Sequence, residues 1–381
     1  MIKRVRICNF KSLGDVTVDL EPITVLIGRS GTGKTNFVEA LRFLRDYLIF
    51  RNELQAVHQA CGGWERVLCA TAAKPFNICF DLTFAAPGVS EDYNYRLLFQ
   101  QPDNKQLPHR VEEMLTLGGQ LLFHTREQKW IQPPRIVQPP APDTLMLGAI
   151  TGIQEITIAY LMLTSEIGCY DFPSTVLLQY QPAESGIEGL ADNGGNSLQV
   201  FQTLVSNLTS LDHWRNIVAS LRCLNRSVQS VDIRLPEKDA VIVSHSVGNQ
   251  ALVLDLAQES EGFRRFLAHL LALYQTPPKQ TLIFEEPEKC IHPGALAALA
   301  GEFKLCVSKR GGQIILTTHS PELLDQFNAE SIRVAEMIDS QTQIGPPASD
   351  QLESLKEHLL DPGELLTVDP ARLITDPVPV G

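Results

Sequence analysis

The sequence lacks several features that would point to a membrane or a fibrous protein. It contains no run of about eighteen apolar residues, so we expect no membrane-spanning helix and no membrane partner. Its basic opening, MIKRVRICNF, is not followed by the apolar stretch of a signal peptide. Long heptad repeats are also missing, which argues against a coiled-coil arm. These absences favour a globular protein located in the cytoplasm.

The cysteines show no metal-binding spacing. None of the eight belongs to a CxxC pair, which argues against a zinc site of common spacing. Cys79 and Cys306 lie in apolar surroundings and are expected to behave as small hydrophobic residues. Reduced thiols are the simplest expectation for a cytoplasmic protein.

Positive charge is scarce relative to negative charge. The formal net charge of −12 argues against a protein that coats nucleic acid. A local basic patch stays open, because Lys3, Arg4, Arg6 and Lys11 cluster near the start and Arg264 precedes Arg265. Solvated surface is the simpler interpretation of such groups. The 381 residues suffice for one large or two modest domains.

The pattern of the chain predicts an α/β protein. The apolar stretch ITVLIG is typical of a strand buried on both faces, and an amphipathic helix follows it after a glycine-rich turn. Residues 77–125 resemble antiparallel strands, with Gly118-Gly119 as a hairpin turn. Residues 143–164 and most of 165–230 suggest helices, and 228–235 a strand. A strong amphipathic helix is predicted at 262–274.

The glycine-rich turn carries the first chemical motif. Residues 28–35, GRSGTGKT, match G-x-x-x-x-G-K-[ST]. Glycines let backbone N–H groups converge on phosphate oxygens, and the following helix presents its positive end. Lys34 can reach the β- and γ-phosphates, and the Thr35 hydroxyl can ligate Mg²⁺. The alternative is a turn that merely links strand to helix. The phosphate-binding residues are Gly28, Arg29, Ser30, Gly31, Thr32, Gly33, Lys34 and Thr35.

Two further motifs follow apolar strands. TLIFEEPEKCIHP brings Glu285 and Glu286 to a strand end, where one carboxylate can hold Mg²⁺ and the other can polarise a water. QIILTTHSP places His319 after another strand, where it could contact the γ-phosphate. Taken alone, the acids could be solvated and the histidine structural. Their order after a phosphate loop favours chemistry.

A fourth motif precedes the helix at 262–274. Ser260 and Gly262 would offer a hydroxyl, an N–H and a helix dipole to an anion. By itself this is an ordinary helix N-cap.

Together the four motifs resemble the ABC-type ATPase heads of the RecF, SMC and OLD group. The opening with NFKS, and Asn36 after GKT, is similar to their N-termini. FEEPEKCIHP is similar to their Walker B motif and catalytic glutamate, ESEGFRRF to their signature, and TTHSP to their switch loop. The likeness covers residues 1–45 and 255–325 well and the middle of the chain only by the order of elements.

The resemblance implies roles for these residues. Asn36 joins the nucleotide-binding set, Glu285 takes the Walker B role with Mg²⁺, Glu286 is the catalytic base and His319 the switch. Two heads would pair head-to-tail around two ATP molecules, so Ser260 and Gly262 would act on ATP held by the partner chain. A larger assembly is the alternative to this dimer.

The resemblance also implies a split architecture. Residues 1–164 and 275–340 would form the ATP-binding core lobe, with a mixed sheet and an antiparallel insertion. Residues 165–274 would form a helical lobe that carries the signature, and 341–381 a peripheral C-terminal tail.

Three departures from the family pattern bear on function. Glu285 stands where Asp is usual, and Glu261 puts an acid inside the signature, which could slow ATP-driven pairing. The 62 residues after His319 contain no Asp-x-Asp, so we expect no TOPRIM nuclease in this chain. An ATP-driven dimeric switch for a separate nuclease or toxin, in DNA-related or antiviral defence, is the leading hypothesis. The alternatives are an ATP-locked scaffold with little turnover and a RecF-like DNA repair ATPase.

Overall fold

The computed structural model describes residues 1–49, 62–69, 76–101, 109–135, 141, 144–150, 152–178, 189–206, 211–234 and 240–374. Backbone contacts divide the chain into two units. The first contains residues 1–167, 329–361 and 368–381, and the second contains 168–328 and 362–367. The predicted lobes were drawn from family likeness rather than from contacts, and that division stays a prediction.

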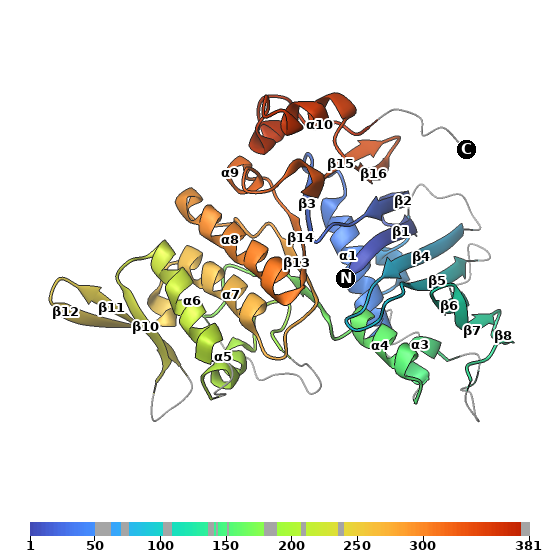
Figure 1. The fold of residues 1–381 in the computed structure, drawn as a ribbon, viewed down its shortest axis with the longest axis horizontal. Helices are drawn as coiled ribbons and strands as arrows, with labels where there is room; N and C mark the ends of the chain where they lie inside the picture. Colours follow the sequence, from blue (N-terminus) through green and yellow to red (C-terminus); the bar gives the residue numbers. More distant parts are fainter. Residues whose placement is uncertain are drawn as a thin grey trace. The chain divides into compact units, whose positions relative to one another are not determined.

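The first unit is built on a mixed sheet in the order β8-β7-β6-β5-β4-β1-β2-β16-β15-β3 (Figure 1). Neighbouring strands are antiparallel except at β16–β2 and β15–β3, which are parallel. The strands are β1 Ile2–Phe10, β2 Leu13–Asp19, β3 Ile23–Ile27, β4 Phe76–Phe84, β5 Tyr93–Gln101, β6 His109–Leu117, β7 Gln120–Arg126, β8 Lys129–Gln132, β15 Ile332–Ile338 and β16 Gln341–Gly345.

Helices complete the first unit. They are α1 Lys34–Ile49, α3 Met146–Ala149, α4 Gln154–Leu163 and α10 Ser349–Lys356, with short 3₁₀ turns at Trp64–Arg66 and Ala329–Ser331. The apolar face of α1 is buried, and Phe43 stacks on Phe80 of β4 with ring centroids 5.8 Å apart. The predicted antiparallel insertion is confirmed as the meander β4–β8. Gly118 and Gly119, both with positive φ, form the predicted β6–β7 turn.

The second unit combines parallel strands with helices. β13 Thr281–Glu285 and β14 Gln313–Thr317 pair in parallel, and β9 Ile167–Tyr170 lies beside β13. The helices are α5 Ser197–Ser206, α6 Leu211–Leu224, α7 Glu261–Tyr274, α8 Pro293–Arg310 and α9 Pro321–Leu324, with 3₁₀ turns at Leu256–Gln258 and Pro362–Leu366. A separate antiparallel sheet contains β10 Val228–Ile233, β11 Val241–Val247 and β12 Gln250–Asp255, beside α6 in Figure 1.

Two features differ from the sequence expectation. Residues 341–345, assigned to a peripheral tail, lie inside the first sheet as β16 between β15 and β2. Only Thr342 and Ile344 alternate inward on this five-residue strand, too short a pattern to identify from sequence. The strands β8, β9, β11, β12 and β15 were also not predicted, and β9 lies within the stretch 165–230 that was expected to be mostly helical.

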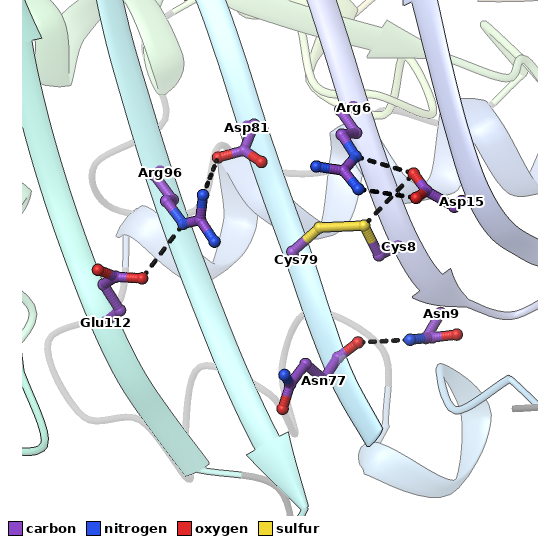
Figure 2. The surroundings of a disulfide bond; sticks show 9 residues. All are labelled: Arg6, Cys8, Asn9, Asp15, Asn77, Cys79, Asp81, Arg96 and Glu112. Carbon is purple, nitrogen blue, oxygen red and sulfur yellow. Dashed lines mark hydrogen bonds and ion pairs between the residues drawn. A yellow bond between two sulfur atoms is a disulfide. The ribbon is translucent and has the colours of Figure 1, made fainter. Parts of the chain in front are cut away.

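The expectation of reduced cysteines is wrong for one pair. Cys8 of β1 and Cys79 of β4 stand directly opposite in register and are joined by a disulfide (Figure 2). Their Cα atoms are 4.8 Å apart, within the range that a disulfide requires. The two residues are 71 positions apart in sequence, so their pairing could not be seen before the sheet was known. Cys306 is buried and free, as expected for a small hydrophobic residue.

Candidate functional site

The phosphate loop connects β3 to α1 in the first unit. Three glycines have positive φ: Gly28 at 144°, Gly31 at 80° and Gly33 at 97°. A Cβ on Gly33 would approach the Thr342 hydroxyl oxygen to 2.0 Å, and one on Gly28 would approach the Ala335 carbonyl oxygen to 2.2 Å. A Cβ on Gly31 would meet nothing within 4 Å. The loop is therefore packed at its two ends and open at its middle, as a phosphate cradle requires.

Lys34 is folded over this loop. Its side chain is buried, and its Nζ donates hydrogen bonds to the carbonyl oxygens of Gly28 at 2.8 Å and Arg29 at 3.0 Å. Arg29, Ser30 and Thr35 are exposed, and Thr32 is buried. The loop thus presents an ammonium group, a helix N-terminus and the Thr35 hydroxyl, which is the donor set that a triphosphate and Mg²⁺ need.

Hydroxyl and amide side chains support the phosphate loop through hydrogen bonds. The buried Thr342 hydroxyl of β16 donates to the Thr32 carbonyl oxygen at 2.9 Å and contacts the Ser12 hydroxyl at 2.6 Å. Asn36 donates to that Ser12 hydroxyl at 2.7 Å. Sequence reasoning found Asn36 but missed Thr342, which lies 310 residues from Thr32 and has no local signal.

The predicted acids lie where β13 ends in the second unit. Glu285 is the last residue of β13 and is aligned with Thr317 of β14, and both acids are half-buried. Glu286 adopts a left-handed backbone with φ of 45°. Its N–H donates to the carbonyl and the hydroxyl of Thr317, each at 3.1 Å. These bonds hold the unusual conformation of the main chain at Glu286.

His319 joins this acid at the end of β14. Its Nε2 lies 4.0 Å from Glu286 Oε1, and Lys289 Nζ forms an ion pair with Glu286 Oε2 at 3.1 Å. The His319 N–H donates to Glu288 Oε1 at 2.8 Å. The structure therefore brings together Glu286 and His319, as the sequence order suggested, and adds Glu288 and Lys289. Their positions within EEPEK gave no signal of their own.

Ser260 and Gly262 begin α7. The Ser260 hydroxyl accepts a hydrogen bond from Phe263 N at 3.2 Å, so it is a helix N-cap. A Cβ on Gly262 would approach the Cys290 carbonyl oxygen to 2.3 Å, so only glycine allows this contact. The signature segment is therefore packed on the loop that follows Glu286.

Glu261 does not present an unpaired charge. Arg265 forms an ion pair with it at 2.8 Å. Hydrogen bonds from Arg265 and then from the Cys290 thiol lower the pKa of the Glu261 carboxyl. The acid that we expected to disturb phosphate binding thus has its own counter-charge one turn along α7.

The basic residues named from the sequence are paired or buried. Lys3, Arg4 and Arg6 form ion pairs with Asp92, Asp19 and Asp15 on the exposed sheet surface, and Lys11 pairs with Glu39. Figure 2 shows the Arg6–Asp15 pair beside the disulfide. Arg264 and Arg265 are buried and donate to carbonyl oxygens, including those of Val176 and Phe172. Neither a solvated surface nor a DNA-binding patch describes Arg264 and Arg265.

Comparisons with known proteins agree on the fold. Residues 1–85 match a family described as an AAA ATPase domain, and residues 203–325 match an AAA domain described as a putative AbiEii toxin of a type IV toxin–antitoxin system. No curated protein matches the chain.

Solved SMC heads share the architecture. The SmcHead bound to the C-winged helix domain of ScpA has a TM-score of 0.56 at 12% identity, over 92% of this chain and 99% of that one. The Pyrococcus furiosus Smc head with an extended coiled coil, bound to the C-terminal domain of ScpA, has a TM-score of 0.56 at 12% identity, over 94% of this chain and 99% of that one. The Thermotoga maritima SMC head has a TM-score of 0.50 at 11% identity, over 91% of this chain and 98% of that one. The chain therefore has the mixed α/β fold of an ABC-type P-loop NTPase, as the solved SMC heads do.

Proposed function

We propose that this chain is an ATP-binding and ATP-hydrolysing switch that works as a head-to-tail homodimer and controls a separate effector. The contact of Glu286 with His319 carries the proposal. A phosphate cradle alone would explain nucleotide binding. A carboxylate and an imidazole held 4.0 Å apart at the ends of two parallel strands supply a base and a phosphate sensor, which hydrolysis needs.

Each residue then has a defined task. The loop Gly28–Thr35, with Asn36, binds the triphosphate, and Lys34 exchanges its carbonyl partners for phosphate oxygens. Glu286 accepts the proton of the attacking water, and His319 responds to the γ-phosphate. Thr35 and Glu285 would hold Mg²⁺, directly or through water. The ion would neutralise phosphate charge.

Ser260 and Gly262 would act on the nucleotide of the partner chain. Their place at the N-terminus of α7 gives an N–H, a hydroxyl and a positive helix end to an anion. The Glu261–Arg265 ion pair supports this role, since it offsets the acid in the segment. Contact between Gly262 and Cys290 would pass the presence of the partner to the loop that holds Glu286.

The effector is proposed to be a separate nuclease or toxin in a DNA-related or antiviral defence system. The toxin–antitoxin description of the family that matches residues 203–325 supports this, and so do two SMC heads solved with ScpA domains bound. The RecF-like repair alternative loses support, because the basic residues that would form its DNA track are paired with acids or buried.

An ATP-locked scaffold with little turnover is the second candidate. The Lys289–Glu286 ion pair favours it, because the ammonium that holds Oε2 must move before that oxygen can accept a proton from water. Slow turnover with normal pairing would be its signature.

ATP turnover of the purified chain with Mg²⁺ tests the proposal. We expect hydrolysis by the wild type and none by Lys34→Ala. Lys3→Ala, which removes a surface lysine paired with Asp92, serves as the matched control and should keep wild-type turnover. A wild type that binds and pairs but barely turns over would select the scaffold. A wild type that binds no nucleotide would overturn the proposal.

A further inference from the structure

Glu288 has no task in the proposed function, yet it links the loop that carries Glu286 to the loop that carries His319. It sits in the turn after β13, which is closed by hydrogen bonds from Lys289 N to Glu286 O at 3.1 Å and from Ile291 N to Glu288 O at 3.0 Å. Left-handed residues at Glu286 and Cys290 bracket this turn. Its backbone is therefore fixed before any ligand arrives.

The Glu288 side chain reaches from this turn to the switch loop. Its Oε1 accepts the main-chain N–H of His319 at 2.8 Å. The neighbouring Thr318 is fully buried, and its hydroxyl accepts the N–H of Ser320 at 3.0 Å. Ser320 in turn caps α9 through Leu323 N at 3.1 Å. Hydrogen bonds thus fix the main chain before and after His319, and Glu288 accepts the hydrogen bond from the His319 N–H itself.

The carboxyl group of Glu288 is only partly satisfied by hydrogen bonds. Its Oε2 is buried and has no hydrogen-bond partner among the residues that the structure describes. Burial is the largest cause that raises the pKa of this carboxyl, and the hydrogen bond from the His319 N–H is the largest cause that lowers it. A buried carboxyl oxygen without a partner is unfavourable, so stability alone is a poor reason for an acid here.

We propose that Glu288 is a positioning residue that sets the place of His319 relative to Glu286. With its main chain fixed, the imidazole keeps only its side-chain rotations, and Nε2 stays in reach of the Glu286 carboxylate. Glu288 acts through His319 and touches no reacting atom. This inference rests on the proposed function, since it concerns the same ATPase site.

Hydrogen–deuterium exchange of the nucleotide-free chain tests the position without activity. Glu288→Met keeps the volume but removes the acceptor, and it should speed amide exchange at residues 318–320. Glu288→Gln keeps an acceptor oxygen and should leave exchange near wild type. Glu322→Ala is the matched control, because that exposed acid accepts from the Ser320 hydroxyl on the same loop but does not hold His319 N–H. Unchanged exchange in Glu288→Met would overturn the inference.

Steady-state kinetics then test the link to His319. Glu288→Met should lower kcat roughly ten-fold with KM for ATP within about two-fold, and Glu288→Gln should retain turnover. His319→Ala and Glu288→Met combined should be no slower than His319→Ala alone, because both remove one function. If the double variant were slower than His319→Ala by the full factor that Glu288→Met causes alone, the inference would be overturned. Absent turnover in the wild type would instead overturn the proposed function, and the exchange result would still stand.

Discussion

The two motif regions of this head are built in opposite ways. The phosphate loop of the first unit consists of glycines and main chain, braced by the partly exposed Ser12 and Asn36 side chains and by the buried Thr342. The second region presents titratable side chains, Glu286, Lys289 and His319, that are each about a third to a half exposed. Uncharged hydroxyls hold the first in one geometry, whereas the second depends on ion pairs open to water.

This difference suggests a division of labour. A loop whose ends allow no Cβ is preformed for phosphate and can bind without rearrangement. A base that is ion-paired to Lys289 and lies 4.0 Å from its histidine is not yet arranged for attack. We therefore expect changes in the first region to alter nucleotide affinity and changes in the second to alter turnover.

The largest effect is expected from Gly33→Ala. The new Cβ would meet the Thr342 and Ser12 hydroxyls at 2.0 and 2.8 Å, in a backbone with φ of 97°. We expect ATP affinity to fall by more than about a hundred-fold, since the loop must deform. Gly31→Ala is the control, because it shares the positive φ but enters open space, and it should lose less. Equal losses in a calorimetric titration would contradict a packed loop.

Acid should loosen the second unit through His269. This buried residue on α7 packs its ring against Phe172 and Phe284, and burial lowers its pKa from 6.5 to about 4. Between pH 6.5 and pH 4, His269 is therefore protonated in the unfolded chain but not in the folded chain. The free energy of unfolding that His269 contributes above pH 6.5 is lost as the pH falls toward 4. At pH 5 this makes the free energy of unfolding about 2 kcal/mol lower than at pH 7.

Urea unfolding at pH 7 and pH 5 measures this effect. His269→Leu should remove that share of the pH dependence. An equal drop in stability in both proteins would show that other groups are responsible.

Thr342→Val should weaken ATP binding about five-fold, because losing the hydroxyl bonds to Thr32 and Ser12 lets the loop relax at a cost in affinity of about 1 kcal/mol. Thr342→Ser keeps the hydroxyl and should restore affinity. We expect kcat to stay near wild type in both. A fall in kcat without a change in affinity would break the division between the two regions.

The smallest effect is expected from Lys289→Met. Its ion pair with Glu286 is half-exposed, so its removal should raise kcat only about two- to four-fold by freeing Oε2. Lys289→Arg keeps the charge and should match the wild type. Slower turnover in Lys289→Met would mean that the lysine supports the base rather than restrains it.

Local patterns predicted the parts of this head that are written in consecutive residues. The strand–loop–helix at the phosphate loop, the helix predicted at 262–274 and the hairpin at Gly118-Gly119 each carry a complete signal within one continuous stretch of the chain. The strands that end in Glu285 and before His319 were found for the same reason, as continuous apolar runs.

Contacts between distant residues could not be predicted in this way. Thr342 lies on a five-residue strand, and its partners are more than 300 positions away. The Cys8–Cys79 disulfide depends on the register of β1 and β4, which no local pattern reveals. Glu288 reads as one acid among three in EEPE, and only the fold shows it bonded to His319.

Mass in solution of Glu286→Gln, with and without ATP and Mg²⁺, tests the central claim most directly. The account predicts a single chain of 42.2 kDa without ATP and a stable dimer of twice that mass with ATP. The dimer should persist because the variant no longer hydrolyses the ATP that holds the two chains together. Lys34→Ala should stay monomeric in both conditions. A Glu286→Gln protein with the same mass in both conditions would contradict an ATP-driven switch.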